Sequence, residues 1–503
     1  MSQGGESFWL GTTSETSYPQ LAGEVPVDVA VVGGGMMGIT AATLLKRAGK
    51  TVALLESKRI VHGATGYTTA KVTAGHGVIY GELTEKFGET GARAYADAQQ
   101  AAIEQIAALA AEDAHFERRP NFVFADTAED ADQLRQEADA EQRLGLPASF
   151  TRETPLPFEV AGALRLENQA QFHPRKYLLP LAAALPGDGS YVFEQTRVQN
   201  ARDGAPCTVT AETGMVRARD VVIATHLPIL DRGLFFAKAH PHRSYAIAAR
   251  IDAADAPEGM FINAGQPTRS IRTMRDGDSV YLNVGGEGHK PGRVDDEPRR
   301  YDALEEYLRR HWPGAGEVEY RWSTMDYLPL DRMPYIGRLR RRSKHVFTGT
   351  GFQKWGMTNG TVAAIIVADR ILGRENAWAS VFESKRWHTR ASTPKFVKEN
   401  ASVGARYLAD RLRLARGPSA DELRPGEGAL VRVRGRKTAV YRDESGELHA
   451  TSPVCRHLYC IVDWNAAERS WDCPCHGSRY SGEGKVIQGP TTRDLKPRKL
   501  PTG

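Results

Sequence analysis

The sequence predicts a chain of several domains, with an α/β nucleotide-binding domain first and a small all-β domain at the C-terminal end. Three observations carry this prediction. The chain has 503 residues, which exceeds the length of one ordinary domain. A strand, a glycine-rich turn and a helix follow one another at residues 27–47. Two pairs of cysteine and histidine residues stand close together at residues 455–476.

The composition is typical of a soluble globular protein, with 41% apolar and 25% charged residues. The 66 basic and 61 acidic residues leave a net charge of +5, which is too balanced to indicate nucleic-acid binding. No apolar run is long enough to span a membrane, and the first residues lack the features of a signal peptide. We therefore expect a cytoplasmic protein with no transmembrane segment and no nucleic-acid partner.

The first element is a β-branched apolar run at residues 27–32, which predicts a buried parallel strand. It leads directly into a G-x-G-x-x-G turn at 33–38 and a helix rich in Ala and Leu at 39–47. A second strand follows at 51–55. A lone G-x-G-x-x-G motif is weak evidence. The order strand, glycine turn, helix and second strand predicts a Rossmann-like dinucleotide-binding fold.

Each glycine of this turn has a mechanical role. Gly33 permits the tight turn, Gly35 lets the backbone approach a pyrophosphate, and Gly38 lets the helix pack on the strand. Glu56 ends the second strand, 23 residues after Gly33, and is placed to accept a hydrogen bond from a ribose hydroxyl. A carboxylate there repels a 2′-phosphate, which argues against NADP.

The fingerprint alone does not distinguish FAD from NAD. A second glycine cluster at 285–288 has the chemistry of a turn, so we expect only one dinucleotide fold. A late strand at 345–351, a glycine-bearing loop and a helix at 361–372 could aim a second helix N-terminus at an anionic flavin ring.

The C-terminal pairs, Cys455 with His457 and Cys473 with His476, have the spacing C-x-H-x15-C-x-x-H. Two thiolates can hold one iron of a [2Fe–2S] cluster while two imidazoles hold the other, which is the Rieske arrangement. Neutral ligands raise the reduction potential to about −150 to +300 mV. The alternative, a structural zinc site, fits poorly because zinc fingers pair Cys with Cys and His with His.

Two further cysteines, Cys460 and Cys475, lie close to these ligands, and we expect a disulfide between them. Residues 455–490 resemble the Rieske domain family, including Cys-Pro-Cys-His-Gly-Ser at 473–478. The resemblance implies that Ser478 and Tyr480 hydrogen-bond the cluster and raise its potential, as in quinol-oxidising complexes. Arg456 and Tyr459 depart from the family pattern, either as a docking surface or as neutral drift.

Residues from about 25 to 390 resemble the FAD-dependent D-amino-acid-oxidase-like (DAO) family, on the fingerprint and on motifs at 63–66, 221–225, 331–337 and 349–352. The whole chain resembles a bacterial subgroup in which such an oxidoreductase is fused to a Rieske domain, and residues 354–360 are typical of it. The resemblance implies FAD as cofactor, held at Gly33, Gly35, Gly38, Glu56, Thr65, Val198, Gly349, Gly351, Trp355 and Gly356.

We expect an N-terminal segment at 1–24, a DAO-like oxidoreductase at 25–384, a linker at 385–420 and a Rieske domain at 421–503. The FAD-binding part, of the glutathione-reductase type, takes about 25–100, 150–230 and 320–384. An antiparallel-sheet substrate domain takes about 231–319, with strands at 244–251, 270–275 and 279–284.

Together these parts predict an enzyme that takes a hydride from an amine or amino-acid-like substrate onto FAD. Electrons then pass singly to the Rieske cluster and on to an external acceptor, which is a protein, a quinone or O2. Two alternatives remain: an O2-using oxidase that forms peroxide, with an accessory Rieske domain, and a reductive enzyme fed through the Rieske domain. The high-potential pattern argues against the reductive enzyme.

The candidate catalytic residues are His289, Asp326 and Lys354. Asp326 stands where we would seek an Arg that binds a carboxylate, which favours a cationic amine substrate, unless Asp326 caps a turn or pairs with Arg321. Lys354 could stabilise negative charge on the reduced ring, and His289 could act as an acid–base group. Tyr67 stands where some relatives attach FAD through a histidine, so we expect non-covalent FAD, with His62 and His76 on either side.

Overall fold

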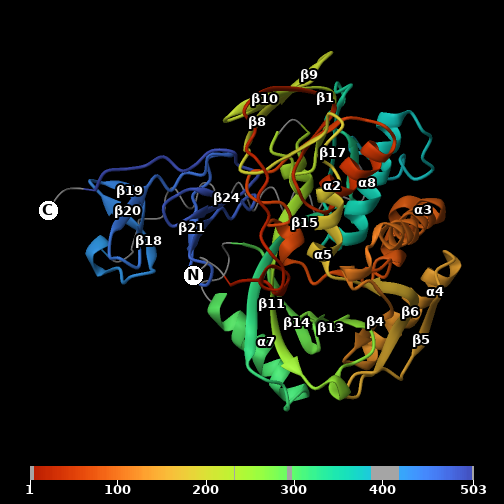
Figure 1. Cartoon of the computed structure of the whole chain (residues 1–503). Coiled ribbons are helices and arrows are strands. Elements are labelled where there is room, and N and C mark those ends of the chain that lie inside the picture. The colour runs from red at the N-terminus through yellow and green to blue at the C-terminus, as the bar shows by residue number, and fades with distance from the viewer. Residues whose placement is uncertain (1–4, 231–232, 292–296, 387–418, 501–503) are drawn as a thin grey trace.

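The computed structural model describes residues 5–230, 233–291, 297–386 and 419–500, and it has three parts (Figure 1). A parallel sheet with its helices lies at the upper right of Figure 1, and a second large sheet lies below it. The small C-terminal module lies to the left of both. The connector expected at 385–420 lies mostly outside the described residues.

The first sheet is the predicted nucleotide-binding sheet, with the order β16-β17-β10-β1-β2-β7 and the pair β8–β9 beside β10. Strands β17, β10, β1, β2 and β7 run parallel, as expected for strands linked by helices. Its strands are β1 (Gly23–Val32), β2 (Val52–Leu55), β7 (Tyr191–Phe193), β8 (Val198–Arg202), β9 (Cys207–Ala211), β10 (Gly214–Ile223), β16 (Tyr335–Arg338) and β17 (Val346–Thr350).

The helices of this part pack on the sheet through apolar faces. Helix α2 (Met36–Arg47) and helix α8 (Gly356–Leu372) pack against each other, α2 through buried Ala, Ile and Leu side chains and α8 through buried Ala, Val and Ile side chains. Helix α8 begins at Gly356, which is five residues before the start that the sequence predicts at 361. The others are α3 (Tyr80–Leu109), kinked at Gly88, and α5 (Pro174–Ala183).

The second sheet has nine strands in the order β15-β11-β14-β13-β12-β4-β6-β3, with β5 beside β6. The predicted substrate domain at 231–319 covers only its middle, because strands before and after that range pair into the sheet. The strands are β3 (Lys71–Val72), β4 (Glu117–Ala125), β5 (Ala148–Thr151), β6 (Gly162–Gln171), β11 (Ala239–Ile251), β12 (Met260–Asn263), β13 (Arg269–Asp276), β14 (Ser279–His289) and β15 (Val318–Pro329). Two helices accompany it, α4 (Ala128–Arg143) and α7 (Glu297–His311).

The glycine cluster at 285–288 is not the turn that the sequence predicts. It forms the end of strand β14, whose pairing with β11 shifts register there. Gly286 has φ +156°, and a Cβ on it would lie 2.0 Å from the Thr268 carbonyl oxygen. The glycine therefore serves close approach of two backbones inside a sheet.

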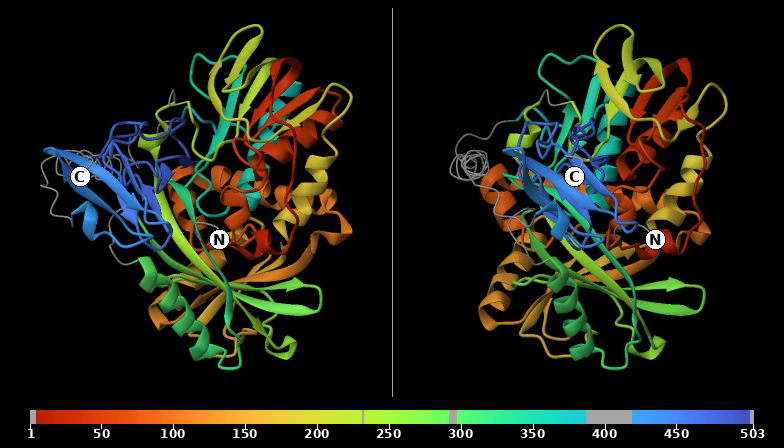
Figure 2. Two further views of the ribbon diagram at one scale, coloured as in Figure 1. Left: turned by 60° about the vertical axis from the view of Figure 1, so that its left-hand side comes forward. Right: turned by 90° about the vertical axis from the view of Figure 1, so that its left-hand side faces the viewer.

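The C-terminal module consists of two small antiparallel sheets. One contains β18 (Gly428–Val433), β19 (Arg436–Arg442) and β20 (Leu448–Thr451). The other contains β21 (Asp463–Asn465), β22 (Ser470–Asp472), β23 (Arg479–Ser481) and β24 (Val486–Gln488). In both views of Figure 2 the module lies against the long strands of the second sheet.

Short elements join these parts. The N-terminal segment expected at 1–24 forms helix α1 (Phe8–Gly11), whose Phe8 and Trp9 are buried in the core. Helix α6 (Phe235–Lys238) precedes β11 and reaches the C-terminal module. The 3-10 turns are Ala64–Tyr67, Glu112–Ala114, Ala253–Asp255 and Ala420–Glu422.

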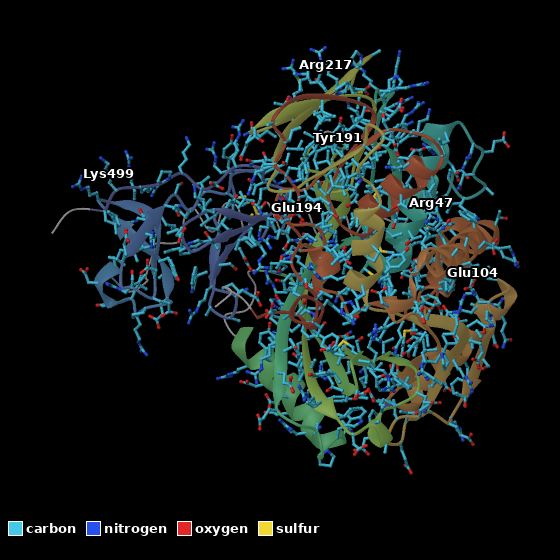
Figure 3. The ribbon with its side chains drawn as sticks, in the orientation of Figure 1. Arg47, Glu104, Tyr191, Glu194, Arg217 and Lys499 are labelled. Carbon is cyan, nitrogen blue, oxygen red and sulfur yellow. A yellow bond between two sulfur atoms is a disulfide. The ribbon has the colours of Figure 1, made fainter. Side chains whose placement is uncertain are left out.

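Charged side chains such as Arg217 and Lys499 lie at the edge of the molecule in Figure 3. Within the described ranges, each helix is too short or too polar to traverse a bilayer.

Candidate active site and iron–sulfur centre

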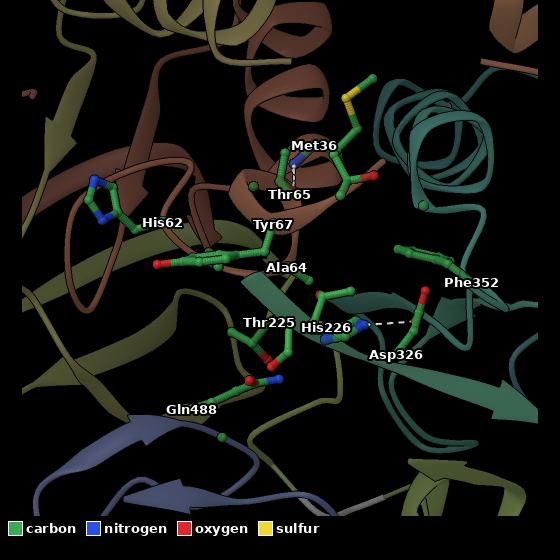
Figure 4. A pocket seen from close by; sticks show the side chains of 18 of the residues that line it. Met36, His62, Ala64, Thr65, Tyr67, Thr225, His226, Asp326, Phe352 and Gln488 are labelled. Carbon is green, nitrogen blue, oxygen red and sulfur yellow. Dashed lines mark hydrogen bonds and ion pairs between the residues drawn. The ribbon is translucent and has the colours of Figure 1, made fainter. Parts of the chain in front are cut away.

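A cavity of about 610 Å³ lies where the three parts of the molecule meet. The glycine-rich turn, the second sheet and the start of helix α8 all line it. The C-terminal module contributes as well: Gln488 of β24 lies in the same pocket as Thr225 and His226 (Figure 4). The cavity is therefore shared between the two predicted cofactor domains.

One end of the cavity is built from the predicted dinucleotide fingerprint. Gly33 has φ +113°, and a Cβ there would lie 2.4 Å from the Ala224 carbonyl oxygen. A Cβ on Gly38 would lie 1.8 Å from the Gly33 oxygen, so the helix packs directly on the turn. The Glu56 carboxylate accepts from Gly34 N at 2.8 Å. These residues fit a dinucleotide with its pyrophosphate at the N-terminus of α2.

The other predicted FAD contacts divide into two groups. Seven line the cavity: Gly33, Gly35, Glu56, Thr65, Val198, Trp355 and Gly356. Thr65 Oγ1 also accepts from Met36 N at 3.1 Å, which ties the 3-10 turn to α2 (Figure 4). The second group lies behind this lining and consists of Gly38, Gly349 and Gly351. A Cβ on Gly349 would lie 2.7 Å from the Ala363 Cβ.

The loop before α8 has an unusual backbone. Gln353 and Lys354 both adopt left-handed conformations, with φ 54° and 70°, which non-glycine residues rarely do. Asp326 holds this turn, because its Oδ2 accepts from Lys354 N at 2.6 Å. The N-terminus of the 17-residue helix α8 then faces the cavity, which suits an anionic ring.

Asp326 lines the cavity and its carboxylate is engaged on several sides. Oδ1 accepts from Tyr327 N at 2.7 Å and lies 2.8 Å from His226 Nε2 (Figure 4). The possible ion pair with Arg321 is absent, because Arg321 pairs with Glu305. These contacts favour the turn-holding role that the sequence left open for Asp326.

Lys354 lines the cavity, and its surface is exposed there. Burial lowers the pKa of its ammonium group to about 8, against the opposing effect of Asp326. A Cβ on Gly288 would lie 3.0 Å from Lys354 Nζ and 2.5 Å from His242 Cε1. Gly288 thus leaves room for two basic side chains at the same point.

His289 is absent from the cavity lining. It lies behind Tyr245, with its Nε2 3.0 Å from the Tyr245 hydroxyl, and its Nδ1 is 3.0 Å from the Lys290 carbonyl. Burial lowers the pKa of its imidazole. Tyr245 lines the cavity and His289 does not, so the His289 imidazole is not at the cavity surface as the expected acid–base role would require.

Tyr67 and the two histidines on either side of it in the sequence differ in their relation to the cavity. Tyr67 and His62 line the cavity, and His62 Nε2 contacts Glu15 Oε2 at 3.0 Å. His76 is buried outside the cavity lining, stacked on Trp355 at 4.8 Å between ring centroids.

Sequence reasoning missed several basic residues of the cavity wall, among them Lys71, His226 and His242. Lys71 is almost fully buried, donates to the Phe261 carbonyl, and has a pKa well below its usual value because of burial. They come from β3, the loop after β10, and β11. His226 directly follows the motif at 221–225, but no short pattern links it to Lys71 or His242, so only the tertiary fold brings the three together.

The four predicted cluster ligands converge in the C-terminal module. Cys455 and Cys473 are buried free thiols, and the His457 and His476 rings are 5.1 Å apart. A hydrogen bond with Cys473 lowers the pKa of the Cys455 thiol to about 6, and the same contact raises that of Cys473. His476 Nδ1 is buried without a hydrogen-bond partner, as a metal-binding nitrogen would be. The donor set fits a Rieske cluster.

Two hydroxyl groups lie beside these ligands, and their expected effect on the cluster potential stays a prediction. Tyr480 Oη lies 3.2 Å from Cys455 Sγ and accepts from Arg456 N at 3.0 Å. Ser478 is buried, and its Oγ accepts from Thr491 N at 3.2 Å. The expected disulfide joins Cys460 and Cys475.

A buried charge network fixes the C-terminal module to the second sheet. Arg243 of β11 donates to the Asp472 carboxylate of β22, and both side chains are at most 6% exposed. Arg479 pairs with Asp472 and with Glu468, whose Oε1 accepts from the Tyr301 hydroxyl at 3.1 Å. Glu468 and Arg479 also line the cavity.

Known proteins share each part of this architecture. The FAD dependent oxidoreductase (DAO) family matches residues 28–370, which is more than half of the chain, and the Rieske [2Fe-2S] domain matches 417–499. A Bacillus subtilis (strain 168) protein named as a Rieske 2Fe-2S iron-sulfur protein, YhfW, is 34% identical over 98% of this chain and 97% of its own. The cytochrome b6-f complex iron-sulfur subunit of Synechococcus sp. (strain JA-2-3B'a(2-13)) is 36% identical over 20% of this chain and 62% of its own.

Solved structures resemble the oxidoreductase part. Glycine oxidase from Geobacillus kaustophilus has a TM-score of 0.61 at 20% identity, covering 72% of this chain and all of that one. L-amino acid deaminase from Proteus vulgaris has a TM-score of 0.60 at 15% identity, covering 74% and 100%. These likenesses show the fold. The chain therefore belongs to the DAO family of FAD-dependent oxidoreductases and carries a C-terminal Rieske domain, so that it is an enzyme with FAD and a [2Fe–2S] cluster as cofactors.

Proposed function

We propose that this enzyme oxidises an amine or amino-acid-like substrate and delivers the electrons singly, through the Rieske cluster, to an external acceptor. Bound FAD would accept a hydride, which is two electrons and one proton, and the cluster would transfer electrons one at a time. The observation that carries the proposal is the shared cavity, because residues of the cluster module and the dinucleotide turn line the same space.

The substrate class rests on the family and on the names of structural neighbours. Glycine oxidase and L-amino acid deaminase are named for oxidation at a carbon bearing nitrogen. Arg321, beside Trp322, pairs with Glu305 and is absent from the cavity lining, whereas Asp326 lies in the cavity wall. Since His226 and Lys354 already engage Asp326, a cationic amine would have to share that carboxylate. Amines and α-amino acids are therefore both candidates.

The three candidate catalytic residues have different roles in this proposal. Lys354 reaches the cavity as a cation below about pH 8 and would stabilise negative charge on the reduced ring. Asp326 positions Lys354 by holding its backbone. His289 orients the Tyr245 hydroxyl, which contacts it, rather than touching substrate itself.

The decisive experiment mixes the oxidised holoenzyme anaerobically with a panel of amines and α-amino acids in a stopped-flow spectrometer. We expect flavin bleaching first and the Rieske absorption change second for the correct substrate. A Cys473→Ser variant, which keeps the FAD site, should show only the first change. If the flavin bleaches while the cluster stays oxidised, and peroxide forms quantitatively in air, the enzyme is an oxidase and the electron route proposed here is wrong.

A further inference from the structure

Strand β15 lies between the cavity and the loop 473–478 of the cluster module, while other residues of that module, such as Gln488, line the cavity themselves. Along residues 324–327 its side chains alternate, as they must in a strand. Thr324 and Asp326 line the cavity. Met325 and Tyr327 face the other way, toward the loop that carries the second pair of cluster ligands. The cavity and this loop are thus separated by one strand.

The packing on the cluster side is close. A Cβ on Gly477 would lie 2.7 Å from Met325 Sδ and 3.1 Å from Pro241 Cβ, and Pro241 pairs with Tyr327 across β11 and β15. Only glycine fits at position 477 without displacing this wall. The loop 473–478 therefore sits directly on β15.

Tyr327 makes the direct contact across this boundary. Its side chain is 1% exposed, and its hydroxyl donates to the His476 carbonyl oxygen at 3.0 Å. The other side of its ring meets the His226 ring, with the centroids 4.8 Å apart and the planes at 73°. His226 lines the cavity and contacts Asp326 (Figure 4).

We infer that Tyr327 is the bridge through which electrons pass from the flavin cavity to the Rieske cluster, with His226 as its contact on the cavity side. The inference rests on the proposed function. Each passage moves one electron and no atoms: the reduced flavin loses it, the cluster gains it, and a one-electron acceptor of the external partner then removes it. Asp326 is a positioning residue, since it fixes both His226 and the Lys354 turn.

The test needs no substrate, because FAD in the anaerobic holoenzyme can be reduced by a light pulse with a deazaflavin sensitiser. The cluster is then followed by its absorption and its EPR signal. The variants are Tyr327→Phe, which keeps the ring and removes the bond to His476, and Tyr327→Leu, which removes both. Tyr301→Phe is the matched control, because Tyr301 also donates across the same interface, but to Glu468 rather than to a cluster ligand.

We expect cluster reduction to slow at least tenfold in Tyr327→Phe, to slow further in Tyr327→Leu, and to be unchanged in Tyr301→Phe. Redox titration of both centres, which is independent of transfer, should show potentials near those of the wild type. A shift of about 59 mV in the potential difference is a tenfold change in the equilibrium constant, and the rate changes by less than that, so only a shift well above this value would explain a tenfold rate loss by driving force and overturn the inference.

Unchanged rates in both Tyr327 variants would also overturn it, because electrons would then leave the cavity by another path. Failure of the proposed function has a different signature, namely a wild-type cluster that stays oxidised after the flavin is reduced. If Tyr327→Leu loses iron or FAD, the rate measured in Tyr327→Phe decides whether Tyr327 is the bridge, since that variant retains the volume of the ring.

Discussion

The two ends of the cavity are built in different ways. The dinucleotide end consists of backbone brought close by glycines, mostly within the stretch from Gly33 to Glu56, with the Ala224 carbonyl packed against Gly33. The wall beside the cluster consists of side chains far apart in the chain. Tyr327 and His476 are separated by 149 positions, and Arg243 and Asp472 by 229.

This difference sets what each end can tolerate. A backbone site fails when any atom is added, whereas a side-chain site fails when a partner is removed and a buried group is left unpaired. The backbone end of the cavity serves the binding of a cofactor, whereas the side-chain wall serves electron transfer between the two cofactors. Substitutions at the two ends should therefore affect distinct measurements.

The largest expected effect is the loss of one cofactor with retention of the other. Cys473→Ser removes a thiolate from the predicted ligand set, so the purified protein should lose iron, labile sulfide and the Rieske EPR signal. It should keep FAD, because the dinucleotide turn lies in another part of the molecule. Cys207→Ser, at a buried thiol of β9, is the control and should keep both. Iron retained in Cys473→Ser would refute the ligand assignment.

A larger side chain in the dinucleotide turn should produce the opposite result, which is loss of FAD with retention of the cluster. In Gly38→Val the new Cβ would lie 1.8 Å from the Gly33 oxygen, so the turn must move. We expect FAD affinity to fall at least hundredfold, which is about 2.7 kcal/mol, while the Rieske EPR signal persists. Gly49→Ala, at φ +82° with no atom within 4 Å, should cost about 1 kcal/mol in stability and keep FAD. Equal FAD loss in both variants would contradict the steric argument.

The dinucleotide end was predictable from the sequence because strand, turn, helix and acid are neighbours in the chain. The cluster ligands were predictable for the same reason, since the spacing of Cys455, His457, Cys473 and His476 itself specifies the chemistry. Lys71, His226 and Tyr327 were not, because no short pattern relates a strand of one sheet to a loop of another domain. The glycines at 285–288 misled the prediction, since close approach within a sheet and a turn both require glycine.

The buried charge pair across the interface should have an intermediate effect. Asp472→Ala would leave the Arg243 guanidinium, 1% exposed, without its carboxylate, and we expect a loss of about 3–5 kcal/mol of unfolding free energy. Asp132→Ala, which breaks an exposed pair with Arg135, should cost less than about 1 kcal/mol. Chemical denaturation followed by the cluster absorption measures both. A small loss in Asp472→Ala would mean that the module is held mainly by apolar contacts.

The pH dependence of this contribution has a definite sign. Burial raises the pKa of Asp472, but Arg243 and Arg479 lower it further, so the folded value lies below the ordinary one. The stabilisation is then complete above the unfolded pKa of about 3.9 and is lost as the pH falls through the folded value. The difference in stability between wild type and Asp472→Ala should therefore shrink in strong acid and stay constant near neutrality.

The smallest effect concerns the electrostatics of the ring end. Lys354→Met removes the ammonium that the strained turn aims into the cavity, so the FAD potential should fall by about 30 mV or more, which is tenfold for a two-electron couple. A plot of the wild-type FAD potential against pH should also show an additional slope from uptake of a proton, beginning at or above about pH 8. The reason is that a negative reduced ring raises the lowered pKa of Lys354, and the variant should lack this slope.

Lys58→Met is the control. Lys58 also lines the cavity, with a pKa lowered to about 8 mainly by burial, but its backbone N donates to Glu56 at the ribose end. That variant should weaken FAD binding and leave the potential in place, and an equal fall in both potentials would mean that Lys354 acts through the overall charge of the cavity rather than at the ring.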